Sequence, residues 1–267
     1  MSRIRSIAAF AVSTAFVLAL GACDENKESV DKSADTGAIA VTTASAVAPS
    51  PSAPPAPPVK KVYKCSPGSD VDFHGNAAIE TEVRRKLAKD AGAITPADLK
   101  TIKSVNLSQA TVDDLDPCIF PLFTGAKDVF LGPGDLDDLS PLASLTQLIT
   151  LRASINKVHD LGPLAKMTHM DRLDVGRTAV HDITPIANMG ALTELQLDDT
   201  QVTDISPLRS CKNLEKLSIR RTPIKDISPL KDARKLRFLY IEGAPIEDTN
   251  VLSSLVGNGL KIVRTGQ

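Results

Sequence analysis

Residues 192–208 read Leu192-Thr-Glu-Leu195-Gln-Leu197-Asp-Asp-Thr200-Gln-Val202-Thr-Asp204-Ile205-Ser-Pro207-Leu208, and this pattern returns along the 267-residue chain at intervals of 22 residues. One column of the pattern is aspartate, at Asp138, Asp160, Asp182, Asp204, Asp226 and Asp248. Six units start at Ala126, Leu148, Met170, Leu192, Leu214 and Leu236. A looser unit of 24 residues starts at Ile102. A period held over so many units is typical of a solenoid, in which each unit adds one coil.

Each unit predicts one strand and one tight turn. Leu195 and Leu197 alternate with polar residues, which is the period of a half-buried strand, and stacking of the units places these strands about 4.8 Å apart in a parallel sheet. Ser206-Pro207 resembles a helix N-cap followed by proline at the first helical position. A short helical or 3-10 turn is therefore expected on the side of the coil opposite the sheet.

The unit that contains Asp204-Ile205-x-Pro207-Leu208 resembles the repeats of internalins and similar bacterial leucine-rich-repeat proteins, over residues 102–257 or about seven coils. This resemblance implies an α/β solenoid, a curved horseshoe with a parallel β-sheet on the concave face and short helical or 3-10 turns on the convex face. The family commonly has Asn at its turn position, where the side chain bonds the backbone of the next coil. Here that position is Asn156 once and then Thr178, Thr200 and Thr222, which implies a weaker ladder of hydroxyls.

The two ends of the array are expected to differ from its coils. In residues 62–101 the spacing of Ile79, Val83 and Leu87 indicates the apolar face of a helix, and Thr95-Pro96-Ala97-Asp98 resembles a capping arrangement that opens a second one. This segment is similar to internalin-type caps and predicts a small helical N-terminal cap. Residues 258–267 are expected to form the C-terminal edge.

Residues 1–22 have the character of an export signal. Arg3 and Arg5 precede an apolar run that ends in Leu20-Gly21-Ala22-Cys23, which looks like the lipobox of bacterial lipoproteins. The resemblance implies cleavage before Cys23 and attachment of diacylglycerol and further acyl chains, such as palmitate, to Cys23. The alternative is an ordinary cleaved signal that leaves Cys23 as a free thiol. We expect an exported protein whose lipid anchor holds it to a membrane of the cell envelope, and the choice between inner and outer membrane is open.

Residues 23–61 join this anchor to the cap. They are charged at first, then rich in Ala, Ser, Thr and Pro, and contain no aromatic residue. Such a segment cannot bury enough apolar surface to offset its ordering entropy, so a disordered tether is expected.

Composition and motifs argue against several classes of function. The 31 Lys and Arg balance 32 Asp and Glu, which leaves no basic surplus for nucleic acid. The sequence has no phosphate-binding glycine loop, no His-Glu-x-x-His, no Gly-x-Ser-x-Gly and no Cys-x-x-Cys. The column of aspartates is better explained by local bonds to backbone N–H groups than by metal binding. Asp137, His159 and His181 share another column, but its other members vary, which is typical of a solvent-facing position. We expect no enzyme, no cofactor and no metal site.

A binding surface is expected on the concave face, where repeat arrays usually bind. Aromatic residues are scarce, yet three fall on outward-facing strand positions, and aromatic anchors with Arg are typical of binding hot spots. The candidate residues are Phe130, Arg152, Arg172, Arg177, Asp198, Lys216, Arg220, Arg221, Phe238 and Tyr240. Two columns alternate in sign, so ladders of intramolecular ion pairs are an equal interpretation of the charges. Covering of the last coil is an equal interpretation of Phe238 and Tyr240.

These features predict a non-enzymatic module, a monomer, that binds an unknown protein or another envelope ligand. The alternative is a structural protein that spaces envelope components without a discrete ligand.

Three cysteines are left after lipidation, and an oxidising compartment would allow one disulfide among them. Cys211 takes an interior position of its coil, where a buried thiol is expected. Cys118 takes the interior position of Leu142 in the first, irregular coil, and Cys65 lies in the cap that must cover this coil. The repeat register therefore favours a Cys65–Cys118 disulfide that closes a loop of about 50 residues. The alternative is three reduced thiols.

Overall fold

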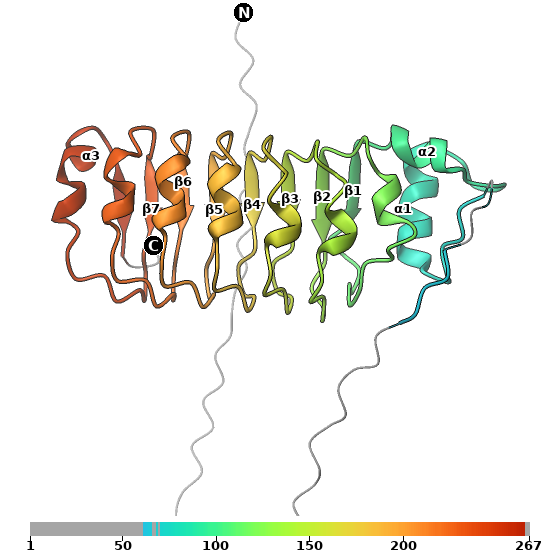
Figure 1. Ribbon diagram of the computed structural model, residues 1–267, viewed down its shortest axis with the longest axis horizontal. Coiled ribbons are helices and arrows are strands. Elements are labelled where there is room, and N and C mark those ends of the chain that lie inside the picture. The colour runs from blue at the N-terminus through green and yellow to red at the C-terminus, as the bar shows by residue number, and fades with distance from the viewer. Residues whose placement is uncertain (1–60, 66–67, 69, 265–267) are drawn as a thin grey trace, which may run out of the picture. The chain divides into compact units, whose positions relative to one another are not determined.

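The computed structural model describes residues 61–65, 68 and 70–264, and the expected signal segment, Cys23 and nearly all of the tether lie outside these residues. In the described residues, none of the helices combines the length and the apolar character needed to cross a membrane. Short coils stack along one axis, each with a strand on one side and a 3-10 turn on the other (Figure 1). The expected leucine-rich-repeat solenoid is the fold of this chain.

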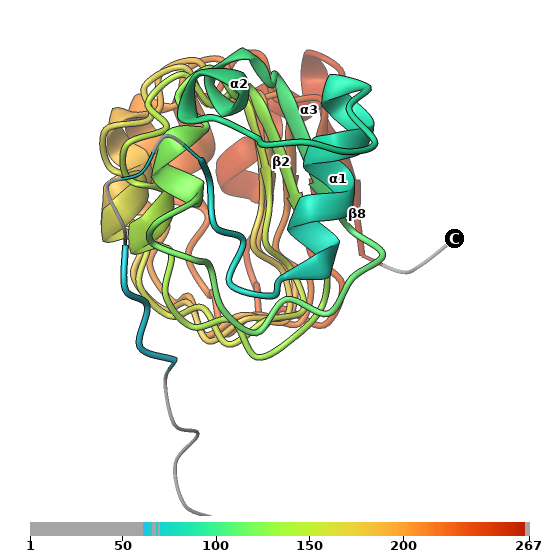
Figure 2. The same cartoon turned by 90° about the vertical axis from the view of Figure 1, so that its right-hand side faces the viewer.

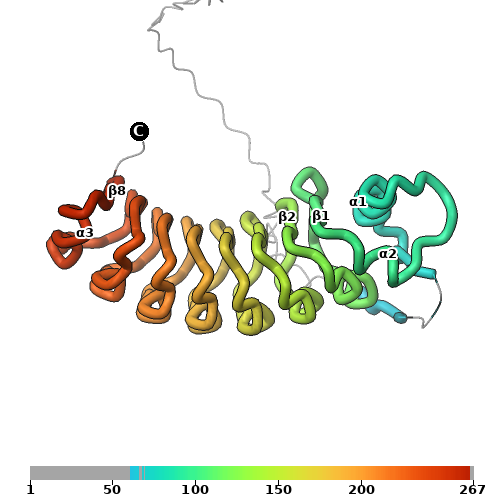
Figure 3. Tube along the Cα trace, turned by 90° about the horizontal axis from the view of Figure 1, so that it is seen from above, coloured from blue at the N-terminus to red at the C-terminus, as the bar shows by residue number. Residues whose placement is uncertain are grey.

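One parallel sheet runs the length of the array, with its strands in chain order. Its strands are β1 (Ser104–Leu107), β2 (Asp128–Leu131), β3 (Thr150–Arg152), β4 (Arg172–Asp174), β5 (Glu194–Gln196), β6 (Lys216–Ser218), β7 (Phe238–Tyr240) and β8 (Lys261–Val263). From β2 to β7 each paired strand residue lies 22 positions from its partner in the next strand, so the sequence period is the register of the sheet. Seen from above, the strands lie along one gently concave side and the turns along the other (Figure 3).

The opposite side of the array consists of short 3-10 helices. They are η1 (Phe120–Leu122), η2 (Ser140–Leu142), η3 (Gly162–Leu164), η4 (Thr184–Asn188), η5 (Ser206–Ser210), η6 (Ser228–Asp232) and η7 (Asn250–Leu252). The expectation that Ser206 caps its turn is wrong, because Ser206 lies inside η5 and the preceding Ile205 has no capping side chain. Instead Oδ1 of Asp204 accepts the N–H of Ser206 at 2.7 Å, and the other aspartates of the column act alike. The aspartate side chain thus accepts the first backbone N–H group of each turn.

The interior of the coils is aliphatic. Leu195, Leu197, Val202, Ile205 and Leu214 have no exposed surface, and the equivalent residues of the other coils are similarly buried. Full burial of such a side chain contributes about 1.5–3 kcal/mol relative to an exposed one. Because each coil exposes its faces to its neighbours, this stabilisation exists only when the coils stack.

The turn position after each strand differs from the expected ladder. The amide of Asn156 donates to Ala153 and Ser154 and also to Gly132 of the preceding coil. The hydroxyls of Thr178, Thr200 and Thr222 each donate to the carbonyl three residues earlier in the same coil. Threonine is too short to reach a second coil, so these hydroxyls close their own turns and join no coils together.

Two helices cover the N-terminal end of the array (Figure 2). They are α1 (Ala77–Leu87) and α2 (Pro96–Thr101), and α2 opens with a reciprocal capping box between Thr95 and Asp98. Glu82 of α1 is 7% exposed and accepts the N–H of Asn106 in β1 at 2.9 Å. This contact supplies a partner to an N–H group at the open edge of the sheet, where unpaired strands invite aggregation.

At the other end, helix α3 (Ser253–Gly257) and strand β8 close the array. The strand β8 pairs with β7 through Phe238↔Lys261 and Tyr240↔Val263. The C-terminal segment therefore adds one strand beyond the last repeat.

Cys65 and Cys118 form a disulfide, while Cys211 is a buried free thiol. The expected place of Cys118 is nevertheless wrong, since it is half-buried and not inside the coil. The two extra residues of the first coil shift its turn, and Ile119 and Phe120 are the fully buried residues there. This shift leaves Cys118 at the surface of the coil, within reach of Cys65.

Candidate binding surface

The concave face is defined here by the outward-facing side chains of β1–β8 and of the residues just after each strand. Two side chains per strand point outward, because the residue between them is buried in every strand from β2 to β7. Consecutive strands repeat every 22 residues, so outward residues of neighbouring coils stand side by side in columns. The ten candidate residues all lie on this face or directly beyond its strands.

An aromatic pair stands on β7. The rings of Phe238 and Tyr240 are stacked with 6.5 Å between centroids and 15° between planes. The guanidinium of Arg220 lies 4.5 Å from the centre of the Tyr240 ring, and the ammonium of Lys261 lies 5.9 Å from that of Phe238. Phe238 is 39% exposed although it is a large apolar residue.

The aromatic pair does not cover the last coil. Strand β8 is the last strand of the sheet and covers the edge of β7, and helix α3 also lies at this end of the array. Of the two interpretations of Phe238 and Tyr240, the geometry favours an exposed anchor with a cation at each end. Sequence reasoning missed Lys261, because β8 lacks the repeat pattern.

Several charges of the middle coils are paired with each other. Lys216 bonds Glu194 at 2.6 Å, and this ammonium lowers the pKa of Glu194 against the opposing effect of burial. Asp198 accepts the hydroxyl of Ser218 at 2.6 Å and the backbone N–H of Arg220 at 2.8 Å, and its other oxygen lies 3.8 Å from the Arg220 guanidinium. Asp198 is thus a positioning residue for Arg220, which in turn contacts Tyr240.

A second set of charges lies just beyond the strands. Asp199 lies between Arg177, at 3.6 Å, and Arg221, at 2.6 Å. The Arg221 guanidinium lowers the pKa of the Asp199 carboxyl, and Asp199 in turn raises the pKa of Arg221. Arg177, Asp199 and Arg221 therefore form the ion-pair ladder that the alternating charges of this column predict. Arg172 departs from its column and lies 3.6 Å from Asp171 of its own coil.

The residues of this second set have an unusual backbone. Ile155, Arg177, Asp199 and Arg221 have φ between 50° and 61°, and the equivalent residue of the last coil is Gly243 with φ 71°. A left-handed conformation costs a residue with a Cβ atom about 1–2 kcal/mol. Ile155 is β-branched, 43% exposed and without a polar group that could stabilise the turn. The same conformation at the same place in five consecutive coils makes it a feature of the turn that follows each strand.

A shallow depression of about 600 Å³ lies over β2–β5. Its walls include Phe130, Arg152 and Arg172 together with Asp174 and Glu194. Nε of Arg152 donates to Ser154 at 3.2 Å and lies 3.5 Å from Asp174, so Arg152 is held over the depression. The concave face therefore offers two places for a partner, this polar depression and the aromatic pair.

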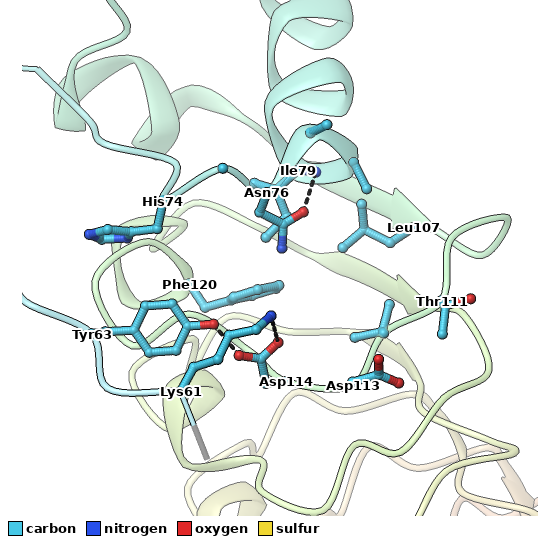
Figure 4. A pocket seen from close by; sticks show the side chains of 14 residues that line it. Lys61, Tyr63, His74, Asn76, Ile79, Leu107, Thr111, Asp113, Asp114 and Phe120 are labelled. Atoms are coloured by element: carbon cyan, nitrogen blue, oxygen red, sulfur yellow. Dashed lines mark hydrogen bonds and ion pairs between the residues drawn. The ribbon is translucent and has the colours of Figure 1, made fainter. Parts of the chain in front are cut away.

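Two further cavities lie where the N-terminal segment meets the first coil. One of about 260 Å³ is lined by Lys61, Tyr63, His74 and Asp114 among others (Figure 4). The ammonium of Lys61 lies 3.2 Å from Asp114, and the hydroxyl of Tyr63 donates to the same carboxylate. Burial and then Asp114 raise the pKa of Tyr63. A groove of about 530 Å³ beside it continues along the first two coils.

Sequence reasoning missed a cluster at this junction. Nδ1 of His74 lies 2.6 Å from Oδ2 of the buried Asp116, and these two residues with Cys118 bring three possible metal ligands within 4.8 Å of one another. The hydrogen bond that the ring donates to the Asp116 carboxylate raises the pKa of His74. In the sequence, only the short spacing Asp116-x-Cys118 hints at such a cluster. The residues that complete it, His74 and Cys65, lie 42 and 53 residues from their contacts.

The fold is that of a leucine-rich-repeat solenoid. The family described as leucine-rich repeats (2 copies) matches residues 191–232. No curated protein matches the chain.

Solved structures of other leucine-rich-repeat proteins share this fold. An internalin C2 from Listeria monocytogenes has a TM-score of 0.64 and 26% identity, over 71% of this chain and 93% of its own. An internalin (inlF) from the same organism has a TM-score of 0.63 and 24% identity, over 70% of this chain and 55% of its own, so the match spans about half of that chain. A plant peptide hormone receptor, RGFR1 in complex with RGF2, has a TM-score of 0.55 and 16% identity, over 64% of this chain and 30% of its own. The chain is internalin-like in fold.

Proposed function

We propose that this chain is a non-enzymatic module that binds a protein, or another ligand of the cell envelope, through its concave face, and that a lipid anchor at Cys23 displays it from a membrane. The observation that carries the binding proposal is the aromatic pair. Phe238 is exposed and Tyr240 is half-buried on the same strand, and a cation flanks each ring. Large, rigid aromatic side chains with Arg are the residues that dominate binding energies at protein interfaces.

The paired charges refine this proposal. Glu194–Lys216 and Asp199–Arg221 are bonded within the molecule, so a partner must replace these bonds to use the charges, and exposed pairs contribute only about 0–1 kcal/mol. The aromatic rings require no such exchange. A partner that fits them presents apolar groups, with carboxylates placed for Arg220 and Lys261. A match of this kind fixes orientation more than it adds affinity.

The anchor is supported by the sequence alone. Leu20-Gly21-Ala22-Cys23 resembles a lipobox, and residues 24–60 supply a spacer rich in Pro, Ser and Ala between it and the solenoid. Two or three acyl chains give stable membrane binding, since each buried methylene contributes about 0.8 kcal/mol.

Affinity capture from detergent-solubilised envelope, with the full chain as bait, tests the binding proposal. The wild type is expected to retain a saturable partner that free bait displaces. Phe238→Ala/Tyr240→Ala is expected to lose this partner. The matched control is Val251→Ala/Val256→Ala, which removes two apolar side chains that are 40% and 47% exposed on η7 and α3, away from the sheet face.

The competing role is that of a spacer in the envelope, which the charge pairs within the concave face favour. A spacer retains no saturable partner. Equal capture by the wild type and by the aromatic variant would contradict binding through the aromatic pair.

A further inference from the structure

Four metal-ligating side chains meet where the N-terminal segment crosses the first coil. Nδ1 of His74, a carboxylate oxygen of Asp116 and Sγ of Cys118 all lie within 4.8 Å of one another. Sγ of Cys65 is bonded to Sγ of Cys118, so reduction of this bond would place a second thiol beside the cluster. The set offers two sulfur atoms, one imidazole nitrogen and one carboxylate oxygen.

This donor set fits zinc. Zinc prefers four ligands in a tetrahedron, with bonds of about 2.3 Å to thiolate and about 2.0–2.2 Å to imidazole nitrogen or carboxylate oxygen. In such a tetrahedron the ligand atoms lie about 3.3–3.8 Å apart. The three clustered atoms need only small movements to reach that spacing, and the 2.6 Å contact between His74 and Asp116 opens to admit the ion.

The surroundings already orient the ligands. The backbone N–H of Cys118 donates to Oδ1 of Asp116 at 2.7 Å, which leaves Oδ2 directed at His74. The second ring nitrogen of His74 lies 3.7 Å from Asp72, and the ring meets Tyr63 edge to face at 5.5 Å. A histidine that binds a metal commonly has its other nitrogen directed at a carboxylate, which fixes the tautomer and the ring plane. Asp72 is placed for this role.

We propose that reduction of the Cys65–Cys118 disulfide converts this junction into a structural zinc site formed by Cys65, His74, Asp116 and Cys118. A dithiol reductant transfers two electrons and two protons to the disulfide, so two cysteine thiols form and the reductant becomes a cyclic disulfide. Zinc then binds and displaces both thiol protons. The disulfide and the metal exclude each other, because a sulfur atom in the disulfide has no thiolate charge to donate. Cys65 is exposed, so a reductant can reach the bond.

Each state ties the segment around Cys65 to the first coil. The disulfide joins the segment around Cys65 to the first coil at Cys118. The metal would join these two and also the loop that carries His74, just before α1. The contacts of Lys61 and Tyr63 with Asp114 lie beside this junction (Figure 4). The cap would thus be linked to the first coil by the disulfide under oxidising conditions and by zinc under reducing conditions.

Cobalt(II), as a spectroscopic substitute for zinc, tests the proposal on the full chain carrying Cys23→Ser. The reduced protein is expected to bind one equivalent and to show the charge-transfer band of two thiolates and the visible bands of tetrahedral cobalt, which zinc then abolishes. The oxidised protein is expected to show neither. His74→Ala and Asp116→Asn are each expected to weaken zinc binding at least about tenfold, and Cys65→Ser to halve the charge-transfer band.

Matched controls separate this site from chance binding. Cys211→Ala removes the buried thiol, and His159→Ala removes a histidine of the coils, and both are expected to leave affinity and spectrum unchanged. His74 has an exposed ring edge, so His74→Ala is expected to keep the fold, and circular dichroism checks this. Failure of the reduced wild type to bind cobalt would overturn the proposal. A tetrahedral spectrum that survives His74→Ala and Asp116→Asn would also overturn it.

Discussion

The guanidinium of Arg221 donates two hydrogen bonds to the carboxylate of Asp199 in the preceding coil, Nε to Oδ1 and Nη2 to Oδ2, both at 2.6 Å. Arg177 approaches the same carboxylate from the other side. Three consecutive coils are therefore linked along one edge of the concave face, and the backbone of all three residues is left-handed. These charges stabilise one another in the free protein, whereas the rings of Phe238 and Tyr240 are contacted by the cations of Lys261 and Arg220.

The ion pair predicts a specific response to acid. Because Arg221 lowers the pKa of Asp199, the pair stabilises the fold above the pKa that this carboxyl has in the unfolded chain. That contribution is lost as pH falls through the lower pKa of the folded state. We expect Arg221→Gln to move the pKa of Asp199 back up towards its usual value, measured by carboxyl NMR titration. An unchanged titration curve would contradict the pairing, and Lys225→Gln, outside the ladder, is the control.

The left-handed column predicts opposite effects of adding and removing Cβ atoms. Ile155→Gly is expected to raise the free energy of unfolding by about 0.5–1 kcal/mol, since relief of the strained backbone exceeds the entropy cost of glycine. Gly243→Ala is expected to lower it by about 1 kcal/mol or more, because a Cβ atom there would lie 2.9 Å from Cγ of Arg221. Urea denaturation measures both. A stabilising Gly243→Ala would show that this column is not strained.

The disulfide predicts a further change in stability. Cys65→Ser is expected to lower the free energy of unfolding by about 2–4 kcal/mol, because the bond constrains the unfolded chain over 53 residues of separation. Peptide mapping without reductant should yield the linked Cys65 and Cys118 peptides. Cys211 should react with alkylating agents only after unfolding, since it is buried and this burial raises its pKa. A linked peptide containing Cys211 would contradict this arrangement.

The anchor proposal predicts a modified N-terminus. The mature protein should begin at Cys23 and carry the mass of its acyl chains, as intact mass spectrometry would show. Cys23→Ala should move the protein out of the membrane fraction, while Cys211→Ala should not. An unmodified Cys23 in a wild-type protein that fractionates without membranes would exclude the anchor.

The repeat could be read from the sequence because the solenoid converts a linear period into a spatial register. Once Leu195 and Leu197 are placed in a strand, the residues 22 positions away share their neighbours, and the concave columns follow. The arrangement of Phe238 beside Tyr240 needs only this register. The role of Asp204 as a local acceptor also follows from a short-range rule.

The remaining features depend on irregular parts of the chain. The two-residue insertion of the first coil moves Cys118 out of its column, and no period describes such a shift. His74 meets Asp116 through a loop outside the repeat, so their contact has no pattern in the sequence. Arg172 pairs with Asp171 of its own coil and not along its column. Side-chain rotamers decide between these two pairings, and a column of alternating charges does not determine the rotamers.

The most direct test of the account is the dissociation constant of the captured partner for the wild-type chain and for Phe238→Ala/Tyr240→Ala. A hot-spot aromatic contributes at least about 2 kcal/mol, or roughly thirtyfold in affinity, so the double variant is expected to bind at least about a hundredfold more weakly with unchanged thermal unfolding. The Val251→Ala/Val256→Ala control should bind like the wild type. Equal affinity of the aromatic variant, together with weaker binding of the convex-side control, would contradict recognition through the concave face.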